Sequence, residues 1–182
     1  MIWLILGVAL WWGAHLFKRI APAARAHMGE EKGKKPIAIA LFLSILLMII
    51  GYRMADGAVF WGRHPATVGV NNLLMLVSVY LFAASGMKTA VARKMRHPML
   101  WGMALWAIAH LLVNGDVPSF ILFGGLLVWS FAEMAVINRA VPHWLPPEAQ
   151  PKKKEAMALA GTLIVYGVIV GIHYALGYPT FG

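Results

Sequence analysis

Residues 37–54 read IAIALFLSILLMIIGYRM, an apolar run with no charge before Arg53. A helix needs about 20 mostly apolar residues to cross the hydrocarbon core of a bilayer, so this run predicts a membrane-spanning helix. Five more runs have the same character, and the six predicted spans are residues 2–19, 37–54, 70–87, 99–115, 118–138 and 156–177. The first has no basic residue at its start, unlike a cleaved signal peptide, so we expect it to remain as a span. The predicted fold is all-α: one domain, residues 1–182, forming an integral membrane bundle of about six transmembrane helices.

The composition agrees with a membrane protein and excludes several other classes. Hydrophobic residues make up 60% of the chain and charged residues 13%, with a mean hydropathy of +0.71, whereas a soluble chain is closer to half apolar and a quarter charged. The net charge of +9 would suggest nucleic acid in a soluble protein, but between apolar runs it indicates anionic lipid. We therefore expect the lipid bilayer as partner and no nucleic acid. The absence of cysteine excludes disulfides and thiolate metal sites.

The basic residues predict how the chain is oriented. Fourteen of the sixteen Lys and Arg residues fall in alternate loops, namely those after the first, third and fifth spans. Only Arg53 and Arg63 lie on the opposite side. The positive-inside rule places the three basic loops in the cytoplasm and both termini in the periplasm, as expected for a multi-pass protein of a bacterial inner membrane.

The connections between spans carry further signals. Asn114-Gly115-Asp116, followed by Pro118, predicts a tight turn that makes a helical hairpin of the fourth and fifth spans. The basic stretch 88–96 is typical of a helix at the membrane interface. No internal repeat is evident along the chain.

Four ionisable side chains are predicted to lie at membrane depth: His15, His110, Glu133 and His173. Placing an ionisable side chain in hydrocarbon costs free energy, so the presence of each one calls for a structural or functional explanation. Histidines on separate helices are the usual ligands of b-type haem, and aromatic residues such as Trp106 can cover a flat macrocycle. The structural alternative is that the histidines and tryptophans only fix helix packing, and that Glu133 pairs with a basic residue instead of moving a proton.

The fourth span holds the most informative motif. It begins Arg96-His97-Pro98 and continues through Ala109-His110 to Asn114-Gly115-Asp116, with Trp106 and Asn114 on the same helix face as His110. With this pattern the chain resembles, over essentially its whole length, the NnrU family of bacterial membrane proteins. The resemblance implies an association with denitrification, through the expression or activity of nitrite and nitric oxide reductases.

The family also includes the zeta-carotene isomerases, which share the Arg-His-Pro and Ala-His elements and hold a b-type haem between two histidines. By similarity those ligands are His15 and His110 here, while the role of His97 stays open. The isomerases' His-Arg-Tyr-Asp-Gly element is matched only by residues 52–57, which lack its histidine. The resemblance therefore favours haem more than it favours a carotene substrate.

The depths of the histidines along their predicted helices leave other ligand pairs open. His15 lies about 6 Å inside the predicted cytoplasmic edge and His110 about 16 Å from it. On depth alone His110 would pair with His173, and His15 with His97. Whichever pair binds, Lys18, Arg19 and Arg96 would hold the haem propionates.

Three functions follow as hypotheses. The iron acts on a lipophilic polyene as a cis-trans isomerase. Alternatively it binds nitric oxide, or passes electrons to reductase subunits. In the third hypothesis no cofactor is present, and the chain is a structural accessory protein.

Overall fold

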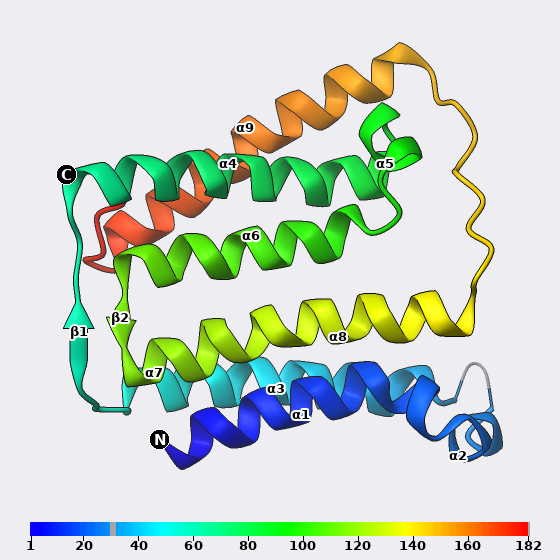
Figure 1. Cartoon of the computed structure of the whole chain (residues 1–182), viewed down its shortest axis with the longest axis horizontal. Coiled ribbons are helices and arrows are strands. Elements are labelled where there is room, and N and C mark those ends of the chain that lie inside the picture. Colours follow the sequence, from blue (N-terminus) through cyan, green and yellow to red (C-terminus); the bar gives the residue numbers. More distant parts are fainter. Residues whose placement is uncertain (30–31, 182) are drawn as a thin grey trace. The chain divides into compact units, whose positions relative to one another are not determined.

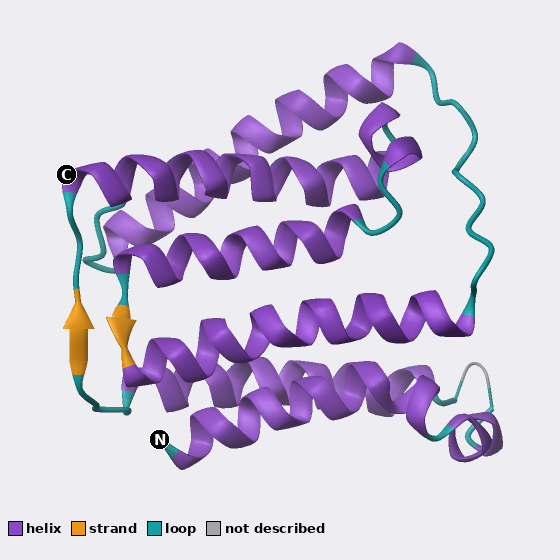
Figure 2. Cartoon of the chain, viewed as in Figure 1, coloured by secondary structure: helices purple, strands orange, loops and turns teal. Residues whose placement is uncertain are grey.

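The computed structural model describes residues 1–29 and 32–181, and these residues are mostly helical (Figures 1 and 2). The chain divides into two compact units, one made of residues 1–60 and 115–140 and the other of residues 61–114 and 141–182. We call them unit 1 and unit 2 and describe each separately.

Unit 1 is built on three long helical segments. Helix α1 packs lengthwise on α3, and it also contacts α8 and the π-helical turn η1 that precedes α8. The elements of the unit are α1 (Ile2–Ile20), α2 (Pro22–His27), α3 (Lys34–Arg53), β2 (Gly115–Asp116), α7 (Val117–Ser119), η1 (Phe120–Gly124) and α8 (Gly125–Ala140). Strand β1 (Val59–Trp61) pairs with β2 and lies where the chain leaves unit 1.

Glycine allows α1 and α3 to approach closely. A Cβ added to Gly51 of α3 would stand 2.6 Å from Leu4 Cα, and one added to Gly7 of α1 would stand 2.7 Å from Met48 N. No side chain fits at such distances, so the two backbones meet directly, as small residues permit between membrane helices. Leu4 is fully buried as a result.

Unit 2 is built around α4 (Pro65–Met87), which packs on both α6 (Pro98–Val113) and α9 (Lys152–Ala175). Proline at the first turn and a capping box between His64 and Thr67 start α4, and a left-handed Lys88 ends it. The short helix α5 (Ala90–Lys94) follows. At the close contact between α4 and α6, the buried Ser78 hydroxyl donates to the Gly102 carbonyl at 2.7 Å.

Within residues 1–29 and 32–181, four helical segments are long and apolar enough to cross a membrane: α3, α4, residues 117–140 and α9. Helix α6 is apolar but shorter, and α1 does not belong to this set. The structure confirms that the chain is mainly helical and that it contains helices able to span a membrane, as the sequence predicts. The interfacial stretch 88–96 contains the helix α5.

The prediction of a tight turn at Asn114-Gly115-Asp116 is wrong. Asn114 has φ −131° and ψ 92°, and Gly115–Asp116 forms the extended strand β2. Pairing satisfies the backbone there, because Val117 N donates to Ala58 O at 3.1 Å and the Asp116 carboxylate caps Ser119 N at 2.8 Å. The helices on either side of this strand, α6 and α8, belong to different units.

Candidate functional site

His15 lies in unit 1 inside a small aromatic cluster. Its Nδ1 is 3.0 Å from the carbonyl oxygen of Trp11, one turn earlier in α1. Its ring centroid is 4.2 Å from that of Trp11 and 4.7 Å from that of Trp129 on α8. The two indoles meet edge to face at 5.4 Å. The imidazole is therefore fixed both by its own helix and by a neighbouring one.

Helices α1 and α8 run side by side in the same direction (Figure 1), and successive turns of the two helices face each other. The Trp12 indole N–H donates to Gly125 O at 3.1 Å, just after the π-helical turn. One turn further His15 meets Trp129, and one turn beyond that Arg19 interacts electrostatically with Glu133.

Three buried polar atoms of this region are left without a partner. Trp11 Nε1, Trp129 Nε1 and Glu133 Oε2 have no hydrogen bond within the described part of the chain. Buried polar groups are nearly always satisfied in native proteins, and an exception calls for an explanation such as a bound group. Two indole donors beside one imidazole could serve a ligand that carries acceptor atoms.

His110 lies in unit 2, near the end of α6. Its Nδ1 is 2.8 Å from the carbonyl oxygen of Trp106, and the two ring centroids are 4.8 Å apart. Both side chains line a mostly apolar pocket of about 430 Å³ between α4, α6 and α9. Asn114 contacts the backbone of His110. Its amide donates to the backbone oxygen of His110 at 2.9 Å and so closes the end of the helix.

The surroundings of His15 and His110 are built from the same short sequence. Trp-x-x-Ala-His-Leu occurs as residues 11–16 in unit 1 and again as residues 106–111 in unit 2. In both copies Nδ1 faces the carbonyl four residues earlier, and the Ala before the His is buried. The element covers only about one and a half helical turns, which is too short for it to stand out as an internal repeat.

The two copies align without a gap, Trp11 with Trp106, Ala14 with Ala109 and His15 with His110. His173 departs from this pattern, because Ile169 stands where the other two histidines have Trp.

His173 and His97, the substitute ligands, occupy different places in unit 2. His173 lines the same pocket as His110, and its Nδ1 is 2.8 Å from Ile169 O. His97 stands at the N-cap position of α6, thirteen residues before His110. That separation is about 20 Å along a helix, so His97 and His110 cannot share one metal atom.

The basic residues expected to hold propionates are spread over both units. Lys18 lines a second pocket, at the end of α1, and Arg19 interacts with Glu133. Arg96 donates to the backbone oxygen of Val141 at the start of the proline-rich connector. The Arg96 guanidinium therefore contacts the backbone of the connector.

The chemistry of the donor atoms suits an imidazole-bound metal. A carbonyl oxygen only accepts hydrogen bonds, so Nδ1 carries the proton in His15 and His110, and the lone pair is on Nε2. A histidine oriented in this way by a carbonyl is the usual form of a metal ligand. No group of three or more His, Asp or Glu residues able to hold a metal occurs among residues 1–29 and 32–181. Each of these two imidazoles therefore has the donor chemistry that a haem iron requires of a ligand.

Comparison with known proteins gives one match. The model of the NnrU family, described as NnrU protein, matches residues 3–180. No curated protein and no solved structure matches the chain. Because the family model covers nearly the whole sequence, the chain belongs to the NnrU family.

Proposed function

We propose that this NnrU-family membrane protein binds one b-type haem through His15 and His110, and that it acts in association with the nitrite and nitric oxide reductases of denitrification. The observation that carries the haem proposal is the repeated Trp-x-x-Ala-His-Leu element, which presents an imidazole in the same way in each unit. The link to denitrification rests on family membership.

Each part of this element has a physical task. The backbone carbonyl one turn earlier holds the Nδ1 proton, which leaves Nε2 as the ligand atom and fixes the ring. The neighbouring indole packs against the imidazole and limits its rotation. When bound, haem would supply an iron that exchanges an axial ligand and carries an electron.

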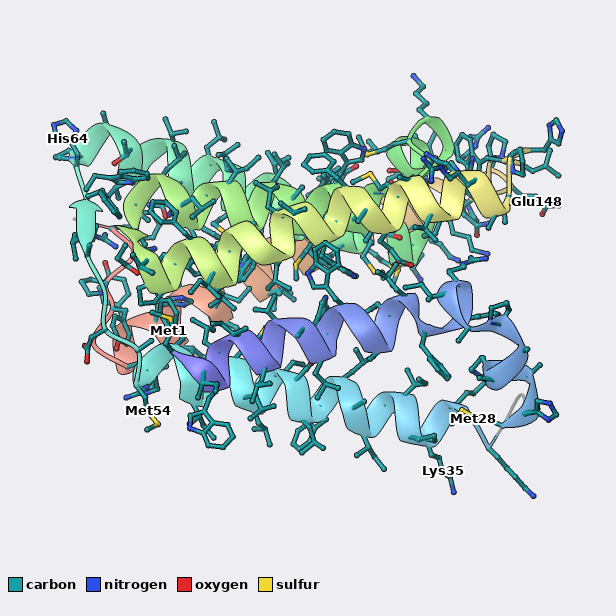
Figure 3. The ribbon with its side chains drawn as sticks, turned by 60° about the horizontal axis from the view of Figure 1, so that its bottom comes forward. Met1, Met28, Lys35, Met54, His64 and Glu148 are labelled. Carbon is teal, nitrogen blue, oxygen red and sulfur yellow. The ribbon has the colours of Figure 1, made fainter. Side chains whose placement is uncertain are left out.

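We further propose six membrane spans with both termini in the periplasm, in a bacterial inner membrane. The basic side chains gather at one end of each unit. In unit 1 this is the end that carries α2 and Lys35, opposite Met1 and Met54 (Figure 3). In unit 2, α5 and the first turn of α9 both carry basic residues. These ends are the cytoplasmic ones under the positive-inside rule.

The test is the absorption spectrum and haem content of the full chain, purified in detergent and incubated with hemin. The intact protein should bind one haem and show a six-coordinate, low-spin spectrum. His15→Ala and His110→Ala should each lose the low-spin signature. His143→Ala, which changes an exposed histidine in the proline-rich connector, is the matched control and should keep it.

His173→Ala decides between the alternative ligand pairs. If His15 and His110 are the ligands, this variant keeps the low-spin spectrum. Its loss, together with retention in His15→Ala, would move the second ligand to His173. A wild-type protein that stays colourless after incubation with hemin would refute the haem proposal.

A second candidate function is cis-trans isomerisation of a lipophilic polyene. The pocket beside His110 favours it, because Met75, Phe82 and Val165 give that pocket an apolar lining. Such a lining suits a hydrocarbon ligand. Turnover of a cis-polyene by the reduced, haem-loaded protein would support isomerisation, whereas binding of nitric oxide without turnover would support the first function.

A further inference from the structure

Another pocket lies in unit 2, where the chain passes from β1 into α4 beside the last turns of α6. Its volume is about 490 Å³. Its lining includes Trp61, His64, Thr67, Ile108, Leu111 and Leu112. None of these residues lines the pocket beside His110, and none belongs to the proposed haem site.

One wall of this pocket is aliphatic and another is aromatic. Ile108, Leu111 and Leu112 come from the last turns of α6 and extend the aliphatic wall over about 6 Å. Trp61, the last residue of β1, is tied to this wall because its indole N–H donates to Leu111 O at 2.9 Å. Hydrocarbon chains and flat rings are the groups that pack against such walls.

His64 brings one hydrogen-bond donor to the pocket. It stands at the N-cap of α4, and its Nδ1 accepts a hydrogen bond from Ala66 N at 3.3 Å. A neutral imidazole carries one proton, so this bond places the proton on Nε2. Within the described part of the chain, Nε2 has no hydrogen-bond partner. The other side-chain donors of the lining are already in use, because Trp61 donates to Leu111 O and the Thr67 hydroxyl donates to His64 O.

The pocket is polar at its edge and apolar toward the middle of the helices. His64 lies at the start of α4 (Figure 3), and residues 111–112 lie in the last turn of α6, so both mark the end of unit 2 opposite α5. Ile108 lies about one turn deeper along α6. Such a gradient suits an amphiphile whose polar end is near the membrane surface and whose tail points into the hydrocarbon.

The polar end of that amphiphile is uncharged, because no Lys, Arg, Asp or Glu lines the pocket among the described residues. We propose that the pocket binds a lipophilic quinone. A ring carbonyl accepts the hydrogen bond from His64 Nε2, the ring packs against Trp61, and the tail lies along the aliphatic wall. An acyl chain of a phospholipid would use only the aliphatic wall, whereas a quinone matches all three parts.

The experiment is photolabelling of the detergent-purified full chain without haem. One probe is a para-benzoquinone with a decyl tail and an azido group on its ring. The second has the same tail and azido group on a benzene ring, which lacks the carbonyl groups. Labelled peptides are identified by mass spectrometry. The quinone probe should label residues 61–67 or 108–112 and should half-saturate at a concentration at least about fivefold lower than the benzene probe, the equivalent of one net hydrogen bond.

Substitutions of His64 test the donor. His64→Asp keeps an oxygen that can accept from Ala66 N, so the cap of α4 is preserved while the donor is lost. It should abolish the preference for the quinone probe. His64→Asn keeps both the cap and an N–H donor and should retain part of that preference. The matched control is His143→Asp, the same change at an exposed histidine of the connector, and it should bind as the wild type does.

A substitution of Gly62 tests the space. Gly62 also lines the pocket, and a Cβ added there meets nothing within 4 Å, so Gly62→Leu adds volume without a clash against the backbone. It should weaken the binding of both probes. Its control is Gly69→Leu, at an exposed position of α4 outside the lining where an added Cβ also meets nothing within 4 Å.

Equal half-saturation of the wild type by the two probes would show a groove for acyl chains and would overturn the proposal. Labelling confined to other parts of the chain would do the same, as would equal behaviour of His64→Asp and His143→Asp. The haem content of these variants is a separate measurement. No substituted residue belongs to the proposed haem site, so loss of quinone binding with normal haem content separates the two proposals.

Discussion

Replacing Gly51 by alanine tests the close approach of α1 and α3. The new Cβ would stand 2.6 Å from Leu4 Cα and 2.7 Å from the Trp3 carbonyl carbon. Carbon atoms are attracted most strongly at about 3.5–4.0 Å, so α1 must move away by about 1 Å. Both obstacles are backbone atoms, which means that no side-chain rotation can relieve the overlap.

The cost follows from the contacts that this displacement weakens. Leu4 is fully buried, and a buried leucine makes about 40–60 atomic contacts of about 0.1–0.2 kcal/mol each. A gap of about 0.5–1 Å forfeits a quarter to a half of that attraction, or about 2–4 kcal/mol around this residue. Alanine's better helix propensity returns about 1 kcal/mol. We expect a net loss of about 1–3 kcal/mol.

The assay is reversible unfolding of the purified protein by SDS in mixed micelles, followed by circular dichroism. Gly167→Ala on α9 is the matched control, because the same change there meets nothing within 4 Å. It should leave the free energy of unfolding unchanged or raise it slightly. If Gly51→Ala and Gly167→Ala gave the same free energy, α1 and α3 would not be in backbone contact at Gly51.

Two further changes test individual hydrogen bonds. Ser78→Ala removes the bond from α4 to Gly102 O on α6 and should cost about 0.6 kcal/mol or more in the same unfolding assay. The equally buried Ser130 donates only within its own helix, to Leu126 O, so a loss in Ser130→Ala as large as in Ser78→Ala would contradict this. Glu155→Gln weakens the 2.6 Å bond that its carboxylate accepts from Ala90 N, and amide hydrogen exchange in α5 should become faster. Glu148→Gln, in the connector, should leave that exchange rate unchanged; protection retained in Glu155→Gln would show that this carboxylate does not hold α5.

The helices could be predicted from the sequence because hydrophobic length is a strong signal in a bilayer. The predicted run 37–54 and the observed α3, Lys34–Arg53, differ by three residues or fewer at each end. The turn at residues 114–116 failed for a different reason. Asn-Gly-Asp is favourable in a turn, but pairing of β2 with β1 offered its backbone a better set of hydrogen bonds, and that partner lies more than fifty residues earlier in the chain.

The candidate site was predictable as a set of residue types and not as an arrangement. His15 and His110 stand out because a polar group in an apolar helix is costly, and the sequence shows this directly. The contact between His15 and Trp129 depends on α1 lying beside α8, which no local pattern specifies. The contact of Arg96 with Val141 likewise depends on tertiary structure.

The discontinuity of unit 1 has a consequence for biogenesis. Helices α1 and α3 leave the ribosome first, but their partner α8 follows only after residues 61–114 have been made. At roughly 5–20 residues per second, this delay lasts several seconds. During that time the Trp12 indole must remain without the Gly125 carbonyl, in lipid or against the insertion machinery. A nascent chain arrested before residue 125 should therefore expose this face of α1 to crosslinking with the translocon.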